Sequence, residues 1–182
     1  MSTGLKNALV KKKKAIIKKW FDTVVDTYPP DTSRFIKSQK DPFANPVGNT
    51  TFHGLKALFD ELVNGMDYET INSFLDPIIR IRAVQDFSPS KAIGFIFLLK
   101  KIIRESLKEA SSGDEEYHMF DERIDKLGLI AFDIYVGCRE KIYEIKSNEF
   151  KNRTFSAFER AGLIKEGKES QDVIQDKNPP TL

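Results

Sequence analysis

Two histidines, His53 and His118, are the side chains best suited to acid–base or metal chemistry in this sequence. A hydrolytic triad needs a base close to a nucleophile, and a metal site needs His, Cys or carboxylates gathered at ligand spacing. No such spacing surrounds either histidine, and no glycine-rich phosphate loop is present. We therefore expect a chain that is not an enzyme, with no catalytic residue, no metal and no cofactor.

The single cysteine, Cys138, is the remaining candidate for redox chemistry. It falls on the apolar face of a predicted helix, which favours a packed thiol over a redox sensor. One cysteine excludes an internal disulfide and is typical of a reducing compartment. The N-terminal lysines are not followed by an apolar stretch of signal-peptide length, so the sequence predicts a cytoplasmic protein.

Four polar side chains precede a strongly apolar run, at Arg80, Arg82, Gln85 and Asp86. Arg82 and Asp86 are four residues apart and could pair within a helix, whereas Arg80 points elsewhere. If these groups are buried, they form a costly network whose use is to fix the structure or to hold a ligand. Both uses remain open. The residues that we expect to line any pocket are these four together with three aromatic ones, Phe74, Phe95 and Phe97.

A basic face is predicted on the first helix, formed by Lys11, Lys12, Lys13, Lys14, Lys18 and Lys19. Residues 1–40 hold ten Lys and Arg against three Asp and Glu, so the positive charge belongs to this end. Basic amphipathic helices bind anionic membrane surfaces, acidic partners or nucleic acid, and ordinary surface helices show the same pattern. Nucleic acid is the least favoured partner, because no reading motif accompanies the charge.

Helical spacing of apolar residues runs through the chain and predicts an all-α fold of about six helices. Pro29 and Pro30 should end the first helix, Asp31 or Thr32 should cap the second, and Pro77 should kink or break the fourth. Residues 41–49 are predicted to form a loop. The predicted helices cover residues 5–28, a short stretch with Phe35 and Ile36, 50–64, 68–87, 89–111 and 115–150, with a further short helix that ends at Gly162.

Residues 92–99 are apolar on every side except for Gly94, and Lys91 and Lys100 bracket them. A helix of this kind must be surrounded by other elements, and eight residues are far fewer than the roughly 20 of a membrane span. Ser88 and Pro89 suit its N-cap and first position. We expect a buried central helix.

The long C-terminal helix carries apolar residues at alternating steps of three and four, which is the spacing of a coiled-coil seam. At 1.5 Å per residue it would measure roughly 54 Å, more than a compact domain of this size needs. We therefore expect a homodimer. Its predicted seam consists of Tyr117, Phe120, Ile124, Leu127, Ala131, Ile134 and Cys138.

The length of 182 residues suits one domain, which we place at residues 1–164, followed by a polar tail at 165–182 that we expect to be disordered.

Two stretches carry a resemblance to a known family. DPFANPVGN at 41–49 and RIRAVQDFSPSKAIGFIFLLK at 80–100 resemble the N-terminal domain of RsbRD-type co-antagonist proteins, over about residues 20–146. The resemblance implies a sensory module placed before a signalling output domain. It also implies a dimeric, globin-like fold without haem, in which helices 51–64, 68–87, 89–111 and 115–150 correspond to E, F, G and H.

No output domain of that kind follows within this sequence. We therefore expect a non-enzymatic signalling module that passes its signal to a separate signalling or regulatory protein. One alternative is a globin-type sensor of haem or a small ligand, although residues 68–87 contain no histidine for the proximal position. The other alternative is an adaptor that touches an anionic membrane surface through the basic helix.

Overall fold

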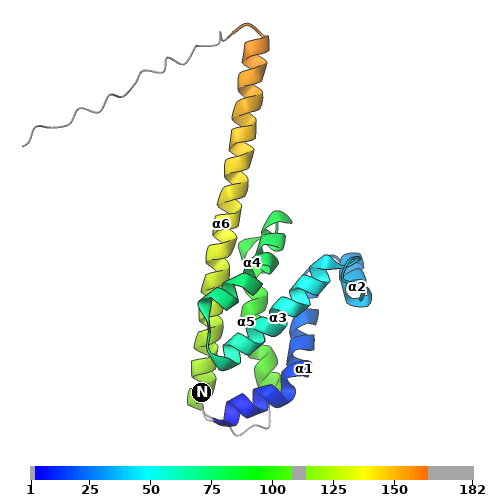
Figure 1. The fold of residues 1–182 in the computed structure, drawn as a ribbon, viewed down its shortest axis with the longest axis vertical. Coiled ribbons are helices and arrows are strands. Elements are labelled where there is room, and N and C mark those ends of the chain that lie inside the picture. The colour runs from blue at the N-terminus through cyan, green and yellow to red at the C-terminus, as the bar shows by residue number, and fades with distance from the viewer. Residues whose placement is uncertain (1–2, 108–113, 164–182) are drawn as a thin grey trace, which may run out of the picture. The chain divides into compact units, whose positions relative to one another are not determined.

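The computed structural model describes residues 3–107 and 114–163, and within these ranges it contains six α-helices and no strand. The helices are α1 (Thr3–Val25), α2 (Pro30–Ser38), α3 (Pro46–Asn64), α4 (Tyr68–Val84), α5 (Pro89–Ser106) and α6 (Asp114–Arg160) (Figure 1). The all-α class and the long C-terminal helix are confirmed. The chain divides into two compact units, residues 1–142 and 143–182, and α6 contributes to both. Among the described residues, no helix is long and apolar enough to cross a membrane.

The first unit is built around one apolar core to which every helix except α2 contributes many side chains. α1 packs against α3 and α5, and α3 packs against α4 (Figure 1). The α1 residues at helical spacing, Leu5, Leu9, Ile16, Trp20 and Val24, are buried, and so are Ile17 and Val25. Burial of this stripe is what makes a lysine-rich sequence a stable helix, because an isolated amphipathic helix gains most of its stability from packing.

Helices α2 and α3 begin earlier than the sequence predicts, each at a proline. α2 starts at Pro30 with Pro29 as its N-cap, so neither Asp31 nor Thr32 caps it. α3 starts at Pro46 rather than near Thr50, and the predicted loop is correspondingly shorter. Proline suits the first position of a helix because the backbone N–H at that position has no acceptor within the helix. Its absence in proline therefore costs no helical hydrogen bond. The missed signal at α3 is Asn45, whose side chain accepts a hydrogen bond from the Gly48 amide at 2.9 Å.

Pro77 does not break α4, which continues from Tyr68 to Val84. Packing against α3 and α5 holds the helix together despite the lost amide donor. The helix ends in a tight turn where Asp86 has a positive φ of 57° and the Phe87 amide donates to the Arg82 carbonyl. Asp tolerates this left-handed conformation better than most residues.

Helix α5 begins at Pro89 with Ser88 at its N-cap, as predicted, although Ser88 makes no capping hydrogen bond. Two other predictions about this helix are wrong. The helix ends at Ser106 rather than at about residue 111, and residues 108–113 lie outside the described part of the chain. The helix is also not buried on every side. Phe97 and Leu98 keep 40% and 45% of their surface exposed, so one side of α5 is only partly covered.

Helix α6 runs without interruption to Arg160, so the separate short helix predicted around Phe155 does not exist. Residues 150–154 contain no Pro or Gly, and Lys151 and Arg153 among them favour helix. The helix stops where Gly162 takes a positive φ of 69°. The Gly162 and Leu163 amides then donate to the Glu159 and Phe158 carbonyls, which satisfies the last turn. The tail predicted at 165–182 lies outside the described residues.

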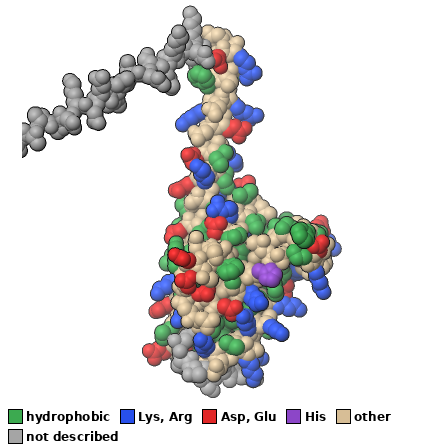
Figure 2. Space-filling view, viewed as in Figure 1, with side chains coloured by type: hydrophobic (Ala, Val, Ile, Leu, Met, Phe, Trp, Pro, Cys, Tyr) green, Lys and Arg blue, Asp and Glu red, His purple; other side chains and the backbone are tan. Residues whose placement is uncertain are grey.

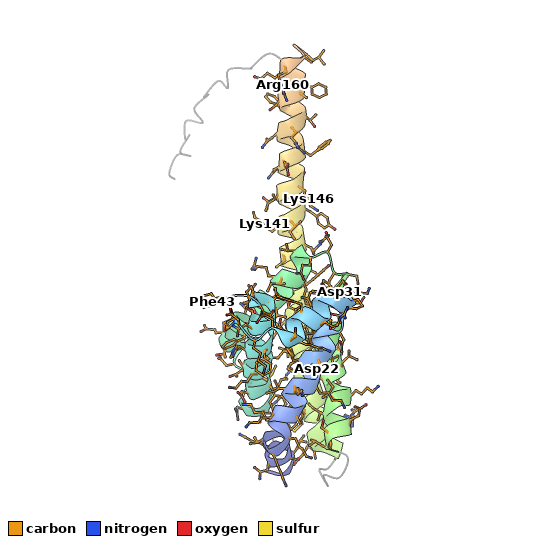
Figure 3. The ribbon with its side chains drawn as sticks, turned by 90° about the vertical axis from the view of Figure 1, so that its right-hand side faces the viewer. Asp22, Asp31, Phe43, Lys141, Lys146 and Arg160 are labelled. Carbon is orange, nitrogen blue, oxygen red and sulfur yellow. The ribbon has the colours of Figure 1, made fainter. Side chains whose placement is uncertain are left out.

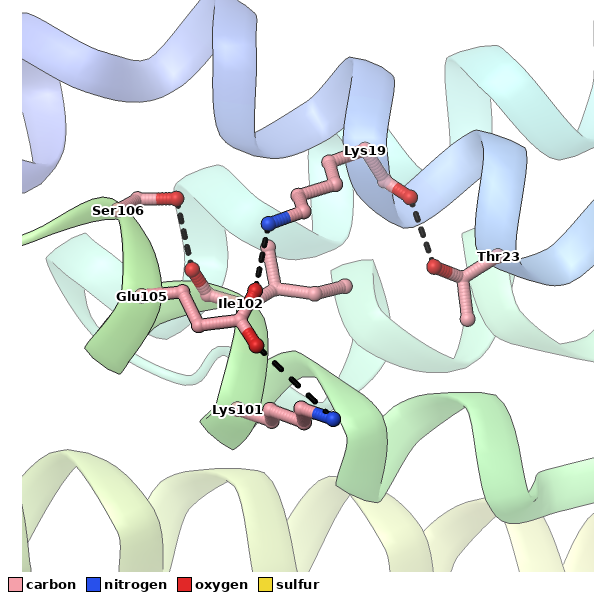
Figure 4. A network of polar contacts seen from close by, with 6 residues as sticks. All are labelled: Lys19, Thr23, Lys101, Ile102, Glu105 and Ser106. Atoms are coloured by element: carbon pink, nitrogen blue, oxygen red, sulfur yellow. Dashed lines mark hydrogen bonds and ion pairs between the residues drawn. The ribbon is translucent and has the colours of Figure 1, made fainter.

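Surface ion pairs join the helices of the first unit. Figure 4 shows Lys19 of α1 bonded to Glu105 of α5 at 2.6 Å, with Lys101 at 3.9 Å from the same carboxylate. Lys100 and Arg104 of α5 pair in the same way with Asp125 and Asp121 of α6. Pairs of this exposure contribute little each, so the apolar core determines the stability of the unit.

Gly54 should tolerate an added methyl group poorly, whereas Gly94 should tolerate it well. A Cβ at Gly54 would lie 2.7 Å from Ile78 Cδ1 and 3.0 Å from the Phe74 carbonyl oxygen, whereas a Cβ at Gly94 meets nothing within 4 Å. Overpacking should make Gly54→Ala less stable by about 1–2 kcal/mol, and helix propensity should make Gly94→Ala more stable by up to about 1 kcal/mol. Urea denaturation of both variants measures the difference, and equal stabilities would show that α3 and α4 are not in close contact.

Candidate functional site

Arg82, in the last turn of α4, is the most unusual residue of the structure. Only 1% of its surface is exposed, although arginine is rarely buried without a charged partner. The residue lies where the end of α1, the end of α4 and the start of α5 meet. Its position follows from the helical periodicity of α4, because Arg82 continues the buried face formed by Ile71, Leu75, Ile78 and Ile79.

The guanidinium of Arg82 links the end of α4 to the start of α5 and to the residues after α1 through hydrogen bonds. Nε donates to the Ala92 carbonyl at 3.1 Å, and Nη2 donates to the Lys91 carbonyl at 2.7 Å. Nη2 also donates to Thr27 Oγ1 at 2.8 Å. These contacts place the first turn of α5 and the chain after α1 against the end of α4.

Aromatic rings surround the same guanidinium. Arg82 Cζ lies 4.3 Å from the centre of the Phe87 ring, 5.4 Å from Phe95 and 5.5 Å from Tyr28. Tyr28 and Phe87 also pack edge to face, with their centroids 5.1 Å apart. Ring faces attract cations, and the attraction is strongest where water is excluded. The rings therefore offset part of the cost of burying the charge.

The positive charge of Arg82 is nevertheless incompletely matched. No carboxylate of the described residues forms an ion pair with it, and Nη1 is buried without a hydrogen-bond partner. Burial lowers the pKa of the guanidinium, and burial raises the pKa of the neighbouring Tyr28 hydroxyl. An orphaned charged donor is rare in a native interior and calls for a specific explanation.

Three hollows lie among the described residues of the first four helices. The smallest, of about 150 Å³, is lined by Tyr28, Thr32, Phe35, Ile36, Ala44, Asn45, Pro46, Val47 and Gln85. A second, of about 430 Å³, is lined by Thr50, Pro77, Arg80, Ile81, Val84 and Gln85. The third, of about 400 Å³, is lined by residues of α1, α2, α3 and the connection from α2 to α3, including Lys37, Lys40 and His53. Tyr28 is the residue that both walls the smallest hollow and contacts Arg82.

The seven residues predicted to line one pocket are not all brought together, although Arg82 contacts Phe95 and both Arg80 and Gln85 line one hollow. Arg80 and Gln85 border hollows, and Arg80 pairs with Asp76 at 2.7 Å. Phe95 is buried beside the Trp20 ring, whereas the ring of Phe97 covers Gly128 on another side of α5. Phe74 is half-exposed on α4. None of the three phenylalanines lines the hollows described above, because their side chains point to different faces.

Asp86 does not pair with Arg82 as the four-residue spacing suggested. Its carboxylate accepts a hydrogen bond from Arg139 Nη1 of α6 at 2.6 Å, and the same nitrogen lies 3.1 Å from the Ala83 carbonyl. The reason is the left-handed turn at Asp86, which carries its side chain away from the helix face that holds Arg82. Tyr135 adds a second tie from α6, as its hydroxyl donates to the Phe87 carbonyl at 2.5 Å.

The predicted dimer seam on α6 belongs to the core of the chain itself. Phe120, Ile124, Leu127, Ala131 and Cys138 are buried, and Tyr117 and Ile134 pack against the core. These side chains are covered by the first unit and offer little surface to a second copy. The three-and-four spacing marks an intramolecular packing face, so the residues assigned to the seam need correction.

The basic face of α1 is partly neutralised. Lys13 pairs with Asp60 of α3 at 2.5 Å, and Lys19 pairs with Glu105 of α5. The other lysines of this face, Lys11, Lys12, Lys14 and Lys18, are exposed.

The three residues first considered for chemistry are separated from one another. His53 and His118 are both exposed, and no group of three or more metal-binding side chains occurs among the described residues. Cys138 is buried, and burial raises the pKa of its thiol. A thiol with a raised pKa is a poor nucleophile at neutral pH.

Sequence reasoning missed Asn45, Tyr28 and Arg139. Asn45 Nδ2 donates to the carbonyls of Ile36 and Gln39 at 2.9 and 3.0 Å, so this one amide shapes the connection from α2 to α3. An Asn directly before Pro is a recognisable helix start and could have been found. The contacts of Tyr28 and Arg139 join residues far apart in the chain and leave no local signal.

Comparison with known families identifies a relationship that covers most of the chain. Residues 14–149 match the family described as RsbT co-antagonist protein rsbRD N-terminal domain. No curated protein and no solved structure matches the chain. The globin-like arrangement of the helices therefore stays a prediction.

Proposed function

We propose a signalling role for this chain, which belongs to the RsbRD N-terminal domain family. Membership covers residues 14–149, most of the sequence, and indicates a sensor module of stress signalling. This match is the observation that carries the proposal. The chain acts without catalysis, by binding a separate signalling or regulatory protein.

The family description supplies the first partner to test, a protein of the RsbT type. Isothermal titration calorimetry should detect a complex between the purified chain and the RsbT-type protein of the same genome. Absence of binding with both proteins at about 100 μM, where complexes with Kd below the millimolar range are visible, would contradict this choice of partner.

The signalling unit is a homodimer in our proposal, and residues 143–161 of the second unit support it. Steps of four and three from residue 143 meet only uncharged residues, which are Tyr143, Ser147, Phe150, Thr154, Ala157 and, just after the helix, Ala161. Phe150 is 71% exposed and lies at the middle of this stripe, which we term the distal stripe. Figure 2 shows hydrophobic side chains between charged ones along this segment, and Lys146 and Arg160 are labelled on it in Figure 3. Such a stripe suits pairing of two helices.

The distal stripe differs in register from the core face of α6. Continuing the three-and-four alternation from Cys138 leads through positions 141, 145, 148 and 152, and this series meets no residue of the distal stripe. The core spacing and the distal stripe are therefore two separate patterns on one helix. We assign the second pattern to pairing with another chain, because Tyr143 and Phe150 are exposed.

Phe150→Glu should convert the dimer to monomer, because it places two like charges at the centre of a paired stripe. Ile145→Glu is the matched control, since Ile145 is similarly exposed but lies off the stripe. Sedimentation velocity at about 50 μM protein should show a dimer for the wild type and for Ile145→Glu. A monomeric wild type, or a dimer disrupted by Ile145→Glu and unaffected by Phe150→Glu, would refute the assignment.

A further inference from the structure

Arg82 carries a positive charge that its surroundings match only in part. A buried cation is tolerated when hydrogen bonds and opposite charge replace the water that it has lost. Arg82 has three hydrogen bonds to neutral oxygens and three neighbouring rings, yet Nη1 has no acceptor. The chemistry that would complete this environment is one anionic acceptor beside Nη1.

A space for such an acceptor lies beside Tyr28, and Arg82 itself does not line it. The hollow of about 150 Å³ shares the Tyr28 side chain with the aromatic cage of Arg82, and its wall includes Gln85, less than one helical turn after Arg82. Tyr28 is only partly buried, and its ring must rotate before a ligand in the hollow reaches Arg82. No acidic residue lines the hollow, and its charge therefore does not oppose an incoming anion.

The lining of this hollow defines what would fit. Most of the lining is apolar and comes from Phe35, Ile36, Pro46 and Val47. Asn45 and Gln85 contribute side-chain amides to it. The volume equals that of about five water molecules at roughly 30 Å³ each, which suits a ligand of five or six non-hydrogen atoms. A dianion such as phosphate would be left half neutralised, because the lining adds no cation to Arg82.

We propose that the hollow and Arg82 together bind a short-chain monocarboxylate, with the carboxylate accepting hydrogen bonds from Arg82 Nη1 and the apolar tail among Phe35, Ile36 and Val47. Binding moves the Tyr28 ring aside and neutralises the unmatched charge. A planar carboxylate suits the guanidinium fork better than a spherical anion does. This inference goes beyond the signalling role and does not depend on the dimer or on the partner protein.

The test uses the full chain and sodium butyrate as the probe, by calorimetric titration and by thermal unfolding. Butyrate should bind one to one and raise Tm as its concentration increases. 1-Butanol has the same tail without the charge, and sodium chloride at equal ionic strength has a charge without the tail. Neither should reproduce the effect. Stabilisation by chloride equal to that by butyrate would identify a simple anion site and overturn the proposal.

Two variants locate the site. Arg82→Met removes the charge and should weaken butyrate binding by at least about tenfold. Ala44→Trp fills the hollow from an exposed loop position and should weaken it as much while leaving Arg82 in place. Arg34→Met, which removes an exposed arginine of α2, is the matched control and should bind as the wild type does. If Arg82→Met fails to fold by circular dichroism, Ala44→Trp decides the matter. Undiminished binding by Ala44→Trp, or no butyrate binding by the wild type, would overturn the proposal.

Discussion

Arg82→Glu is expected to destabilise the first unit by more than about 4 kcal/mol, a loss typical of broken buried charged networks. The variant would place a carboxylate against the Lys91 and Ala92 carbonyl oxygens and against the ring faces of Phe87 and Phe95. Carbonyl oxygens and ring faces both repel negative charge. Since small domains are stable by only about 5–15 kcal/mol, far-ultraviolet circular dichroism during urea denaturation should show early or complete loss of cooperative unfolding.

Arg82→Met separates the effect of charge from that of shape. Methionine fills a similar volume without a charge to bury, and such replacements of buried ions are often close to neutral. We expect a change within about 1.5 kcal/mol of the wild type. Arg82→Glu with the stability of the wild type would show that the guanidinium is not enclosed in the protein.

Trp20→Ala should be the second severe variant, with a loss of about 3–5 kcal/mol. Trp20 is completely buried where α1 meets α5, and its ring packs 6.2 Å from that of Phe95. Its Nε1 donates to the Phe95 carbonyl at 2.9 Å. Truncation removes both the packing and the hydrogen bond, and leaves a cavity in the contact between the two helices.

Two further variants are needed to interpret the result for Trp20→Ala. Trp20→Phe keeps most of the packing and loses the hydrogen bond, so it should cost roughly 1–2 kcal/mol. Phe43→Ala removes an aromatic ring that is 94% exposed and lies at the edge of the first unit (Figure 3), so it should change stability by less than about 0.5 kcal/mol. Thermal unfolding followed by circular dichroism ranks the three. A smaller loss for Trp20→Ala than for Trp20→Phe would contradict the packing described for α1.

Apolar periodicity is sufficient to predict the helices and their class. The stripe of α1 from Leu5 to Val24 is buried as predicted, because side chains three and four residues apart share a face in any helix. The boundaries of the helices are harder to predict from the sequence. Pro30 and Pro46 look like helix breakers in the sequence, but each is the first residue of a helix. Pro77 also looks like a breaker, but packing keeps α4 continuous.

The candidate site could not be derived from spacing alone. Arg82 and Asp86 have the spacing of a helix pair, yet one is buried in an aromatic cage and the other pairs with Arg139, 53 residues away. Asp86 has a left-handed backbone conformation just after α4, and this conformation directs its side chain away from Arg82. Contacts of this kind depend on tertiary structure, and the sequence contains no local pattern that predicts them.

Heptad spacing has a comparable ambiguity. Ile124, Leu127 and Ala131 have the spacing of an intermolecular seam, but a helix on the edge of a globular core has the same requirement for one apolar face. What distinguishes the two cases is whether other helices of the same chain are available to cover that face. The sequence of α6 alone does not contain this information.

The indole of Trp20 gives this protein an intrinsic optical reporter. It is the only tryptophan in the sequence, and Phe95 lies against both its ring and the Arg82 guanidinium. Emission from the chain therefore arises from one environment, one aromatic ring away from the buried cation. Changes in the charge or position of the Arg82 side chain alter the electric field at the indole, so they can be followed as a wavelength shift in unlabelled protein, at concentrations too low for calorimetry.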